Sequence, residues 1–80
     1  MIIQRFSECY EWDTDYSGFD VSAVGDVPSI RACQVLCEAS SECNVFTYAP
    51  GDNNGWCMFK SSDSGRSNFG DKHSGPKICP

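Results

Sequence analysis

The stretch that decides the fold is residues 33–60, CQVLCEASSECNVFTYAPGDNNGWCMFK. Cys33 and Cys37 stand four residues apart, a spacing that puts both side chains on one face of a helix. Apolar residues and cysteines fill most of the helical wheel of this segment, and Ser29 is a favourable N-cap residue just upstream. We therefore expect a helix at about residues 29–40 that is covered on nearly all sides.

A β-hairpin is expected directly after this helix. Residues 44–49 (NVFTYA) and 56–60 (WCMFK) have strand composition, and the loop between them ends in an Asn-Gly step. Side chains alternate along a strand, so Cys57 and Phe59 share one face. We expect that face, together with Phe46 and Tyr48, to pack against the helix.

The remaining segments are expected to complete a small sheet. Residues 1–12 carry apolar and aromatic side chains that predict a first strand, and residues 13–18 (DTDYSG) have turn composition. Phe19, Val21 and Ala23 alternate with polar residues, which predicts a short half-buried strand. Residues 61–76 are rich in serine and glycine and are predicted to form a long mobile loop.

Length and cysteine content set the class of protein. Eighty residues allow one small domain, and domains of this size commonly need cross-links to be stable. The six cysteines, at successive spacings of 24, 4, 6, 14 and 22, include no C-x2-C pair, and the chain has a single histidine. This pattern is typical of disulfides in a secreted protein and not of a zinc site.

The charge distribution excludes two classes of partner. The formal net charge is −5, and residues 1–42 carry eight acidic and two basic residues. An acidic surface of this kind repels nucleic acid and anionic lipid, and no apolar run approaches the length of about 18 residues that a membrane span needs. No signal peptide is visible after Met1, so we expect this chain to be a piece of a longer secreted protein.

Several motifs act together as a family signature. They are Cys33 and Cys37 in a helix, the run Cys43-x2-Phe46-Thr47-Tyr48, the run Trp56-Cys57-x-Phe59-Lys60, and the late Ser74-Gly75-Pro76-Lys77. In these features the chain resembles the PAN/apple domain over nearly its whole length. It is most similar to the apple repeats of apicomplexan (coccidian) microneme adhesins, and more distantly to those of plasma prekallikrein and coagulation factor XI.

The resemblance implies a fold and a disulfide pattern. The fold is α+β, with a single helix packed on a curved antiparallel sheet of about five strands. Spacing alone cannot select among the pairings of six cysteines, but the family implies the nested pairs Cys9–Cys79, Cys33–Cys57 and Cys37–Cys43. One apple/PAN domain is then expected over residues 1–80, with a core at about residues 9–79 and a lead-in or linker at residues 1–8.

Neither a catalytic site nor a bound metal or cofactor is expected. His73 lies in a Ser/Gly-rich segment where a solvated ring is the default, and no serine or cysteine is placed as a nucleophile. The segment DTDYSG matches the first half of an EF-hand calcium loop. Asp20 and Val24, however, stand where the second half needs an apolar residue and a bidentate glutamate.

Recognition is expected at loops, because loops on a rigid framework commonly carry binding residues. Trp12, Tyr16 and Trp56 are expected mainly to pack at the core or its rim, although exposed aromatic rings would also suit protein or sugar contacts. The candidate binding residues are Trp56, Lys60, Arg66, Lys72 and His73.

The function that the resemblance implies is adhesion without catalysis. We expect a module of a secreted multi-apple protein, delivered through the microneme organelle, that lies beside neighbouring apple repeats. Its partner would be another adhesin or the host-cell surface. Two alternatives stay open: a carbohydrate-binding, lectin-like apple domain, and a small disulfide-rich inhibitor.

Overall fold

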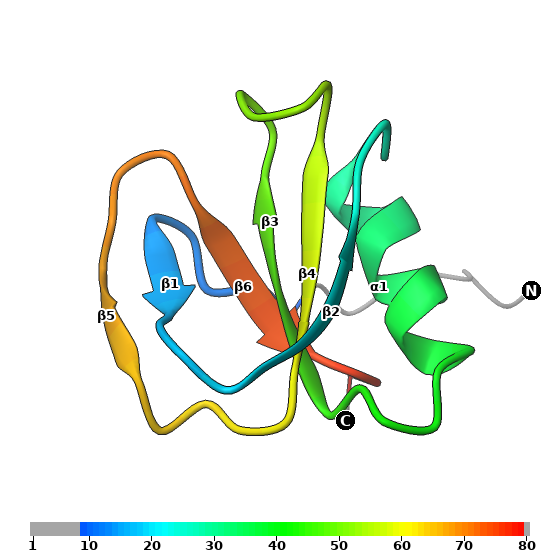
Figure 1. Cartoon of the computed structure of the whole chain (residues 1–80). Helices are drawn as coiled ribbons and strands as arrows, with labels where there is room; N and C mark the ends of the chain where they lie inside the picture. Colours follow the sequence, from blue (N-terminus) through cyan, green and yellow to red (C-terminus); the bar gives the residue numbers. More distant parts are fainter. Residues whose placement is uncertain (1–8, 80) are drawn as a thin grey trace, which may run out of the picture.

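The computed structural model describes residues 9–79, and predictions that fall on residues 1–8 lie outside this range. The described chain contains one helix and six strands (Figure 1). Their bounds are β1 Thr14–Tyr16, β2 Asp20–Val24, α1 Ile30–Glu38, β3 Val45–Ala49, β4 Trp56–Lys60, β5 Arg66–Asn68 and β6 His73–Pro76. The predicted architecture of one helix packed on antiparallel strands is confirmed, and the strands divide into a sheet of four and a sheet of two.

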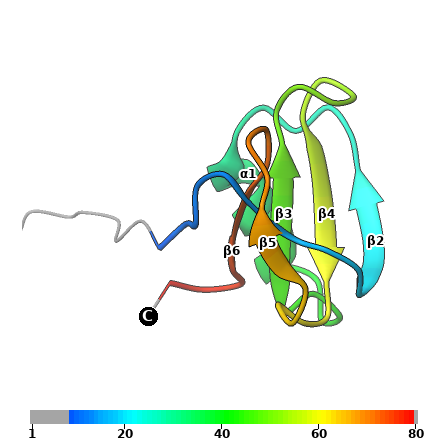
Figure 2. The ribbon, with the colours of Figure 1, turned by 90° about the vertical axis from the view of Figure 1, so that its left-hand side faces the viewer.

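The four-stranded sheet lies between α1 and the two-stranded sheet (Figure 1, Figure 2). Its strand order is β2-β4-β3-β6, and each neighbouring pair is antiparallel. The small sheet pairs β1 with β5. It packs on the face of the large sheet that is turned away from α1, where the backbone N–H of Tyr16 donates a 3.2 Å hydrogen bond to the Oγ1 of Thr47 in β3. Because Thr47 alternates with Phe46 and Tyr48, it belongs to the face opposite the helix.

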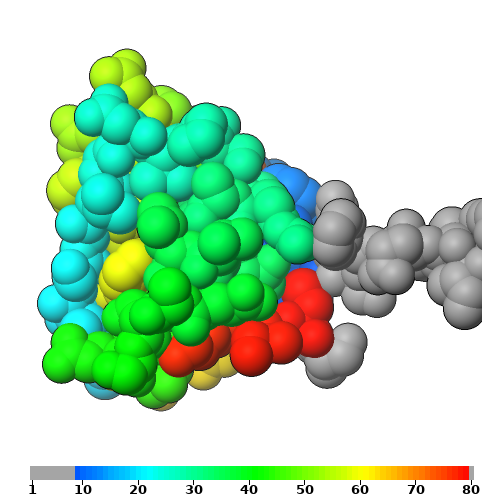
Figure 3. Space-filling model, turned by 90° about the vertical axis from the view of Figure 1, so that its right-hand side faces the viewer, coloured from blue at the N-terminus to red at the C-terminus, as the bar shows by residue number. Residues whose placement is uncertain are grey.

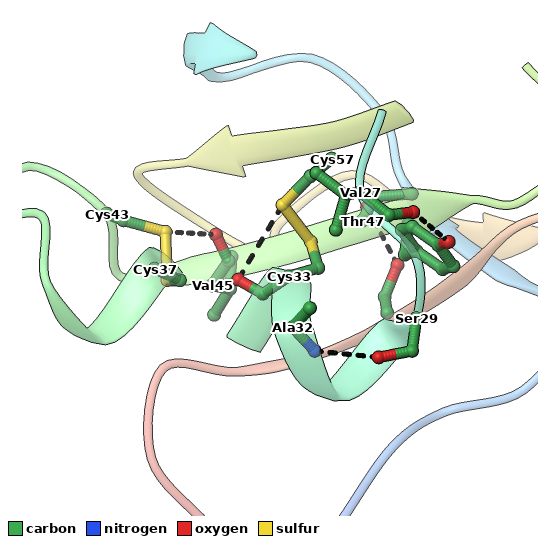
Figure 4. Close-up of a disulfide and its surroundings, with 11 residues drawn as sticks. Val27, Ser29, Ala32, Cys33, Cys37, Cys43, Val45, Thr47 and Cys57 are labelled. Atoms are coloured by element: carbon green, nitrogen blue, oxygen red, sulfur yellow. Dashed lines mark hydrogen bonds between the residues drawn. A yellow bond between two sulfur atoms is a disulfide. The ribbon is translucent and has the colours of Figure 1, made fainter. Parts of the chain in front are cut away.

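Helix α1 begins after Ser29, whose Oγ accepts a 3.0 Å hydrogen bond from the backbone N–H of Ala32 (Figure 4). Val35 and Leu36 on this helix are 47% and 40% exposed, so the prediction of a helix covered on nearly all sides is wrong. The reason is that the sheet covers only one side of α1, and its outer side forms the surface seen in Figure 3. The residues that α1 buries are Cys33, Gln34 and Cys37.

Three disulfides cross-link the described chain, and Figure 4 shows Cys33–Cys57 and Cys37–Cys43. One joins α1 to β4 in the centre of the core, one closes the connection that follows α1, and one joins the two ends of the described chain. In that order the pairs are Cys33–Cys57, Cys37–Cys43 and Cys9–Cys79, the same three pairs as in the nested scheme.

The core between α1 and the large sheet is small. Phe46 and Tyr48 of β3 belong to it, and Phe59 of β4 packs at its margin. The hydroxyl of Tyr48 donates a 2.5 Å hydrogen bond to the carbonyl of Val27, which fixes the chain that enters α1. Gly55 fits against the same carbonyl with a φ of +105°, and a Cβ there would lie only 1.8 Å from the Val27 oxygen.

Two segments that were predicted as turn or loop form strands instead. β1 lies inside residues 13–18. The positive φ angles that mark turns occur on Asp13, before the strand, and on Gly18 and Phe19, after it, so the residues between them are free to be extended. β5 and β6 lie inside residues 61–76, where each is held by a partner strand distant in sequence. In the predicted first strand, residues 9–12 contain only the isolated bridge from Glu11 to Ser74.

The strand predicted around Val21 and Ala23 is present as β2, but it is not half-buried. All of its residues are exposed, because β2 is an edge strand of the large sheet. Phe19 just before it is 51% exposed as well. Alternation of apolar and polar residues indicated the strand correctly, but not which faces of it would be covered.

Candidate binding surface

The five predicted binding residues are spread over several elements. Trp56 and Lys60 lie at the two ends of β4, and Arg66 begins β5. Lys72 directly precedes His73, the first residue of β6. Because Trp56 and Lys60 lie at opposite ends of the same strand, the five residues do not all lie at one end of the molecule.

Lys60 is a structural residue of the fold. Its side chain is 3% exposed, and it forms an ion pair with Asp20, its partner in the β2–β4 register. Its Nζ also donates a 3.2 Å hydrogen bond to the carbonyl of Gly18. These contacts hold the turn before β2 against the end of β4, so we remove Lys60 from the candidate binding residues.

Arg66 belongs to a polar cluster on the small sheet. Its Nε lies 3.0 Å from Oε1 of Glu11, its Nη2 lies 3.1 Å from Oδ2 of Asp63, and its guanidinium carbon lies 5.6 Å from the ring centroid of Tyr16. The Tyr16 hydroxyl donates to the same Glu11 carboxylate. Burial, reinforced by this hydrogen bond, raises the pKa of Tyr16 to about 12. Arg66 is half-exposed and links β5 to Glu11.

Trp12 and His73 form an aromatic cluster at the start of β6. The Trp12 indole is 54% exposed and meets the imidazole edge to face at a centroid distance of 5.1 Å. The Tyr10 ring lies 5.7 Å from Trp12 and 6.2 Å from Phe46, so a row of rings leads from the core to the surface. Nδ1 of His73 accepts a 2.9 Å hydrogen bond from the backbone N–H of Asp13, which leaves the proton of the neutral ring on Nε2.

A pocket of about 230 Å³ opens beside His73. Residues of the β3–β4 turn and of the β5–β6 turn line it, and Figure 1 shows both turns at the same end of the molecule. The ammonium of the adjacent Lys72 lies 4.1 Å from the ring centroid of Phe69. The residues that line the pocket are Pro50, Gly51, Asp52, Gly70, Asp71 and His73. Two carboxylates and an imidazole thus surround a hollow that can receive a polar or cationic group.

A second, apolar groove of about 540 Å³ runs between the end of β2 and the outer side of α1. Val24, Val35 and Leu36 supply much of its exposed apolar surface. It is more open and far less polar than the pocket beside His73. The two hollows therefore differ in the chemistry that they offer to a partner.

The acidic residues of the pocket were not predicted from the sequence, and Trp12 is more exposed than expected. Asp52 and Asp71 were not candidates, and their only signal was a place in two glycine-containing turns, PGD and FGD. Trp12 was expected mainly to pack, yet it is more exposed than Trp56, which is half-buried. Tyr16 does pack, at 3% exposed.

The partial calcium motif, residues 13–18, contains strand β1. In residues 9–79 no group of three or more His, Cys, Asp or Glu side chains could hold a metal ion. Asp15, of the partial calcium motif, lies in β1, and one oxygen of its carboxylate is buried without a hydrogen-bond partner. No helix in the described part of the chain is long and apolar enough to cross a membrane.

A scan against protein families matches residues 12–78 to the PAN domain. The chain belongs to the PAN domain family. The resemblance predicted from the cysteine and aromatic motifs is therefore confirmed.

Two solved structures are similar to this PAN domain. The two N-terminal apple domains of Toxoplasma gondii microneme protein 4 share 25% sequence identity with it at a TM-score of 0.66. That match covers 85% of this chain and 44% of the other, so the PAN domain spans less than half of that two-domain fragment. A PAN module from Eimeria tenella is 27% identical at a TM-score of 0.63, with 98% of this chain and 88% of the other covered. A search of curated proteins found no match.

Proposed function

We propose that this PAN domain is a non-catalytic adhesion module of a secreted protein. Its partner is another protein, either a second adhesin or a protein of the host-cell surface. Membership of the PAN family supports binding without catalysis, and the similar solved structures come from a microneme protein of Toxoplasma gondii and from Eimeria tenella. One domain occupies residues 1–80, with its core at residues 9–79.

The observation that carries this proposal is that the two ends of the described chain and the loop end of the domain lie on opposite sides. The loop end is the end that holds the β3–β4 and β5–β6 turns. Cys9 and Cys79 are joined, with their Cα atoms 5.6 Å apart, and Figure 1 has the C-terminus at the end opposite the β3–β4 turn. A domain that is linked to its neighbours at one end can present the other end to a partner. In a protein with neighbouring apple repeats, several such ends act together, and avidity compensates for weak single contacts.

The disulfides support an extracellular location. Bonds of this kind persist in oxidising compartments, and small secreted domains commonly rely on them. All six cysteines of this chain are paired. Similarity to a microneme protein of Toxoplasma gondii supports the proposal that this chain is secreted through the microneme organelle.

Carbohydrate binding is the second candidate function. The observation that favours it is the exposed Trp12 indole beside His73 and Asp13, because an aromatic face next to polar groups suits a sugar ring. Family membership favours both candidates over the disulfide-rich inhibitor.

A cell-binding experiment tests the proposal. The domain is displayed in several copies on one carrier and offered to host cells and to immobilised secreted adhesins, with a reduced and alkylated domain as the control for folding. Binding that is lost when the cells are treated with protease, but kept after glycosidase treatment, supports a protein partner. Loss after glycosidase treatment alone supports the carbohydrate alternative. A folded multivalent domain that binds neither cells nor adhesins refutes the proposal.

A further inference from the structure

We propose that the pocket beside His73 binds the basic side chain, lysine or arginine, of a protein partner. This inference rests on the proposed function, because it names the chemistry of the partner that the loop end recognises. It uses the pocket formed by the two turns that contain Asp52 and Asp71, together with the Trp12 indole that lies against His73.

The charge of the pocket comes from two carboxylates that have no cation of their own. The ion pairs within residues 9–79 engage the acidic side chains of Glu11, Asp20 and Asp63, and the carboxylate of Asp13 lies 3.9 Å from Nδ1 of His73. Asp52 and Asp71 take part in none of them, and neither carboxylate accepts a hydrogen bond from another described residue. Two uncompensated negative charges on one hollow attract a cationic group and repel an anionic one.

The nearest lysine does not neutralise this charge. Lys72 directly follows Asp71, but its Nζ lies 4.1 Å from the ring centroid of Phe69, a cation–π arrangement. Its ammonium is therefore held on the face of an aromatic ring. The same geometry shows how an exposed ring at this end of the domain can hold a cation, and Trp12, whose indole is the stronger cation binder, is half-exposed beside the pocket.

The pocket walls are ordered before any ligand arrives. In the first turn, the backbone N–H of Asp52 donates to the carbonyl of Ala49 at 3.2 Å, and that of Gly55 donates to the carbonyl of Asp52 at 2.7 Å. In the second turn, the N–H of Phe69 donates to the carbonyl of Asp13 at 2.9 Å. A site whose loops are already fixed loses less conformational entropy on binding.

The net charge of the whole chain points in the same direction. A net charge of −5 steers basic surfaces toward the domain and lowers the affinity for acidic ones. A neutral sugar would gain hydrogen bonds from the carboxylates but nothing from their charge. Salt therefore separates the two kinds of ligand, because it screens ion pairs on an exposed surface and leaves sugar binding almost unchanged.

The test is a titration of the ¹⁵N-labelled domain followed by amide and indole NMR shifts. The probes are the Nα-acetyl methylamides of lysine and arginine, and the uncharged control is the same derivative of norleucine. We expect the two basic probes to shift the signals of Trp12, Asp52, Asp71 and His73, with weaker binding at high salt. The inference is overturned if norleucine shifts the same signals equally, if neither basic probe shifts them, or if galactose does so without a salt effect.

Matched variants locate the binding. Asp52→Asn and Asp71→Asn should each weaken the binding of the basic probes about 2- to 5-fold, the range for an exposed ion pair, and the double variant should abolish detectable binding. Glu42→Gln removes one negative charge from an exposed residue in the connection after α1 and should leave the binding unchanged. Equal effects of Glu42→Gln and the pocket variants would overturn the inference, because only the total charge would then matter.

The cell-binding experiment separates this inference from the proposed function. If the multivalent double variant Asp52→Asn/Asp71→Asn loses binding that the native domain and Glu42→Gln retain, the pocket carries the contact. If the double variant binds as well as the native domain, adhesion stands and the basic-side-chain inference is refuted. If none of the three binds while the basic probes still bind the pocket, the adhesive function fails and the pocket assignment stands.

Discussion

Removing the Cys33–Cys57 disulfide should destabilise this PAN domain more than removing Cys9–Cys79, although it closes the shorter loop. The two perturbations are the double variants Cys33→Ala/Cys57→Ala and Cys9→Ala/Cys79→Ala. The first cuts the link between α1 and β4 inside the core, and the second releases the two ends of the described chain.

Loop entropy alone predicts the opposite order. The entropy of the unfolded chain gives about 3.5 kcal/mol for the 24-residue separation and about 4.4 kcal/mol for the 70-residue separation. Packing reverses this order, because Cys33 and Cys57 are fully buried whereas Cys9 and Cys79 are only half-buried. Truncating each buried side chain adds about 1 kcal/mol through lost contacts and a residual cavity, which brings the inner pair to about 5.5 kcal/mol.

The difference of about 1 kcal/mol corresponds to a melting temperature about 4–8 °C lower for the inner variant in a domain of this size. The assay is thermal unfolding followed by circular dichroism without reductant. Peptide mapping of each variant verifies that the two remaining disulfides are formed between the same cysteines as in the native chain. An inner variant that melts at the same temperature as the outer one, or above it, would refute this reasoning.

Three further predictions concern other contacts of the fold. Lys60→Ala should lower the free energy of unfolding by about 1–3 kcal/mol, and Lys60→Met, which keeps the buried stem, should lower it less; equal losses in urea titrations would contradict this. Gly55→Ala should cost about 3 kcal/mol or more, because its Cβ would lie 1.8 Å from the Val27 oxygen, and an unchanged melting temperature would disprove it. The pKa of Tyr16 is raised from 10.0 to about 12, so the unfolded chain loses this proton first as the pH rises. The stabilisation of the folded state by protonated Tyr16 is complete below pH 10 and is lost as the pH rises to 12. Over that range the melting temperature of Tyr16→Phe should fall less steeply with pH than that of the native domain, and equal slopes would contradict the raised pKa of Tyr16.

The parts of the fold with local signals were predictable. Ser29, the four-residue spacing of Cys33 and Cys37, and the Asn-Gly step at residues 54–55 each act within a few residues. The helix and the β3–β4 hairpin therefore followed from short-range patterns, with the helix ending at Glu38 rather than near residue 40. β1, β5 and β6 did not follow, because these short strands are stabilised by pairing with distant segments, as in the Tyr16↔Arg66 pair.

The candidate site was less predictable than the fold. His73 was among the predicted residues, but Asp52 and Asp71 join it only because the order β4-β3-β6 brings two turns to the same end of the molecule. Lys60 was a predicted binding residue, and its burial was not expected because lysine is rarely buried. The register that pairs it with Asp20 across β2 and β4, which reverses that expectation, depends on a bulge-like shift between Asp20 and Ser22.

The Cys9–Cys79 bond determines how the domain responds to tension. Force that enters at one end of the described chain and leaves at the other passes through two sulfur atoms, with the Cα atoms 5.6 Å apart, and bypasses the sheets and the helix. A cell pulling on a string of such units would stretch the segments between them and leave each fold unstrained. Reduction of this one bond would expose only the segments 9–33 and 57–79 to the pull, because the Cys33–Cys57 bond still bridges the 24-residue separation between them. The 70-residue separation less those 24 leaves 46 residues, so full extension would lengthen each unit by about 160 Å.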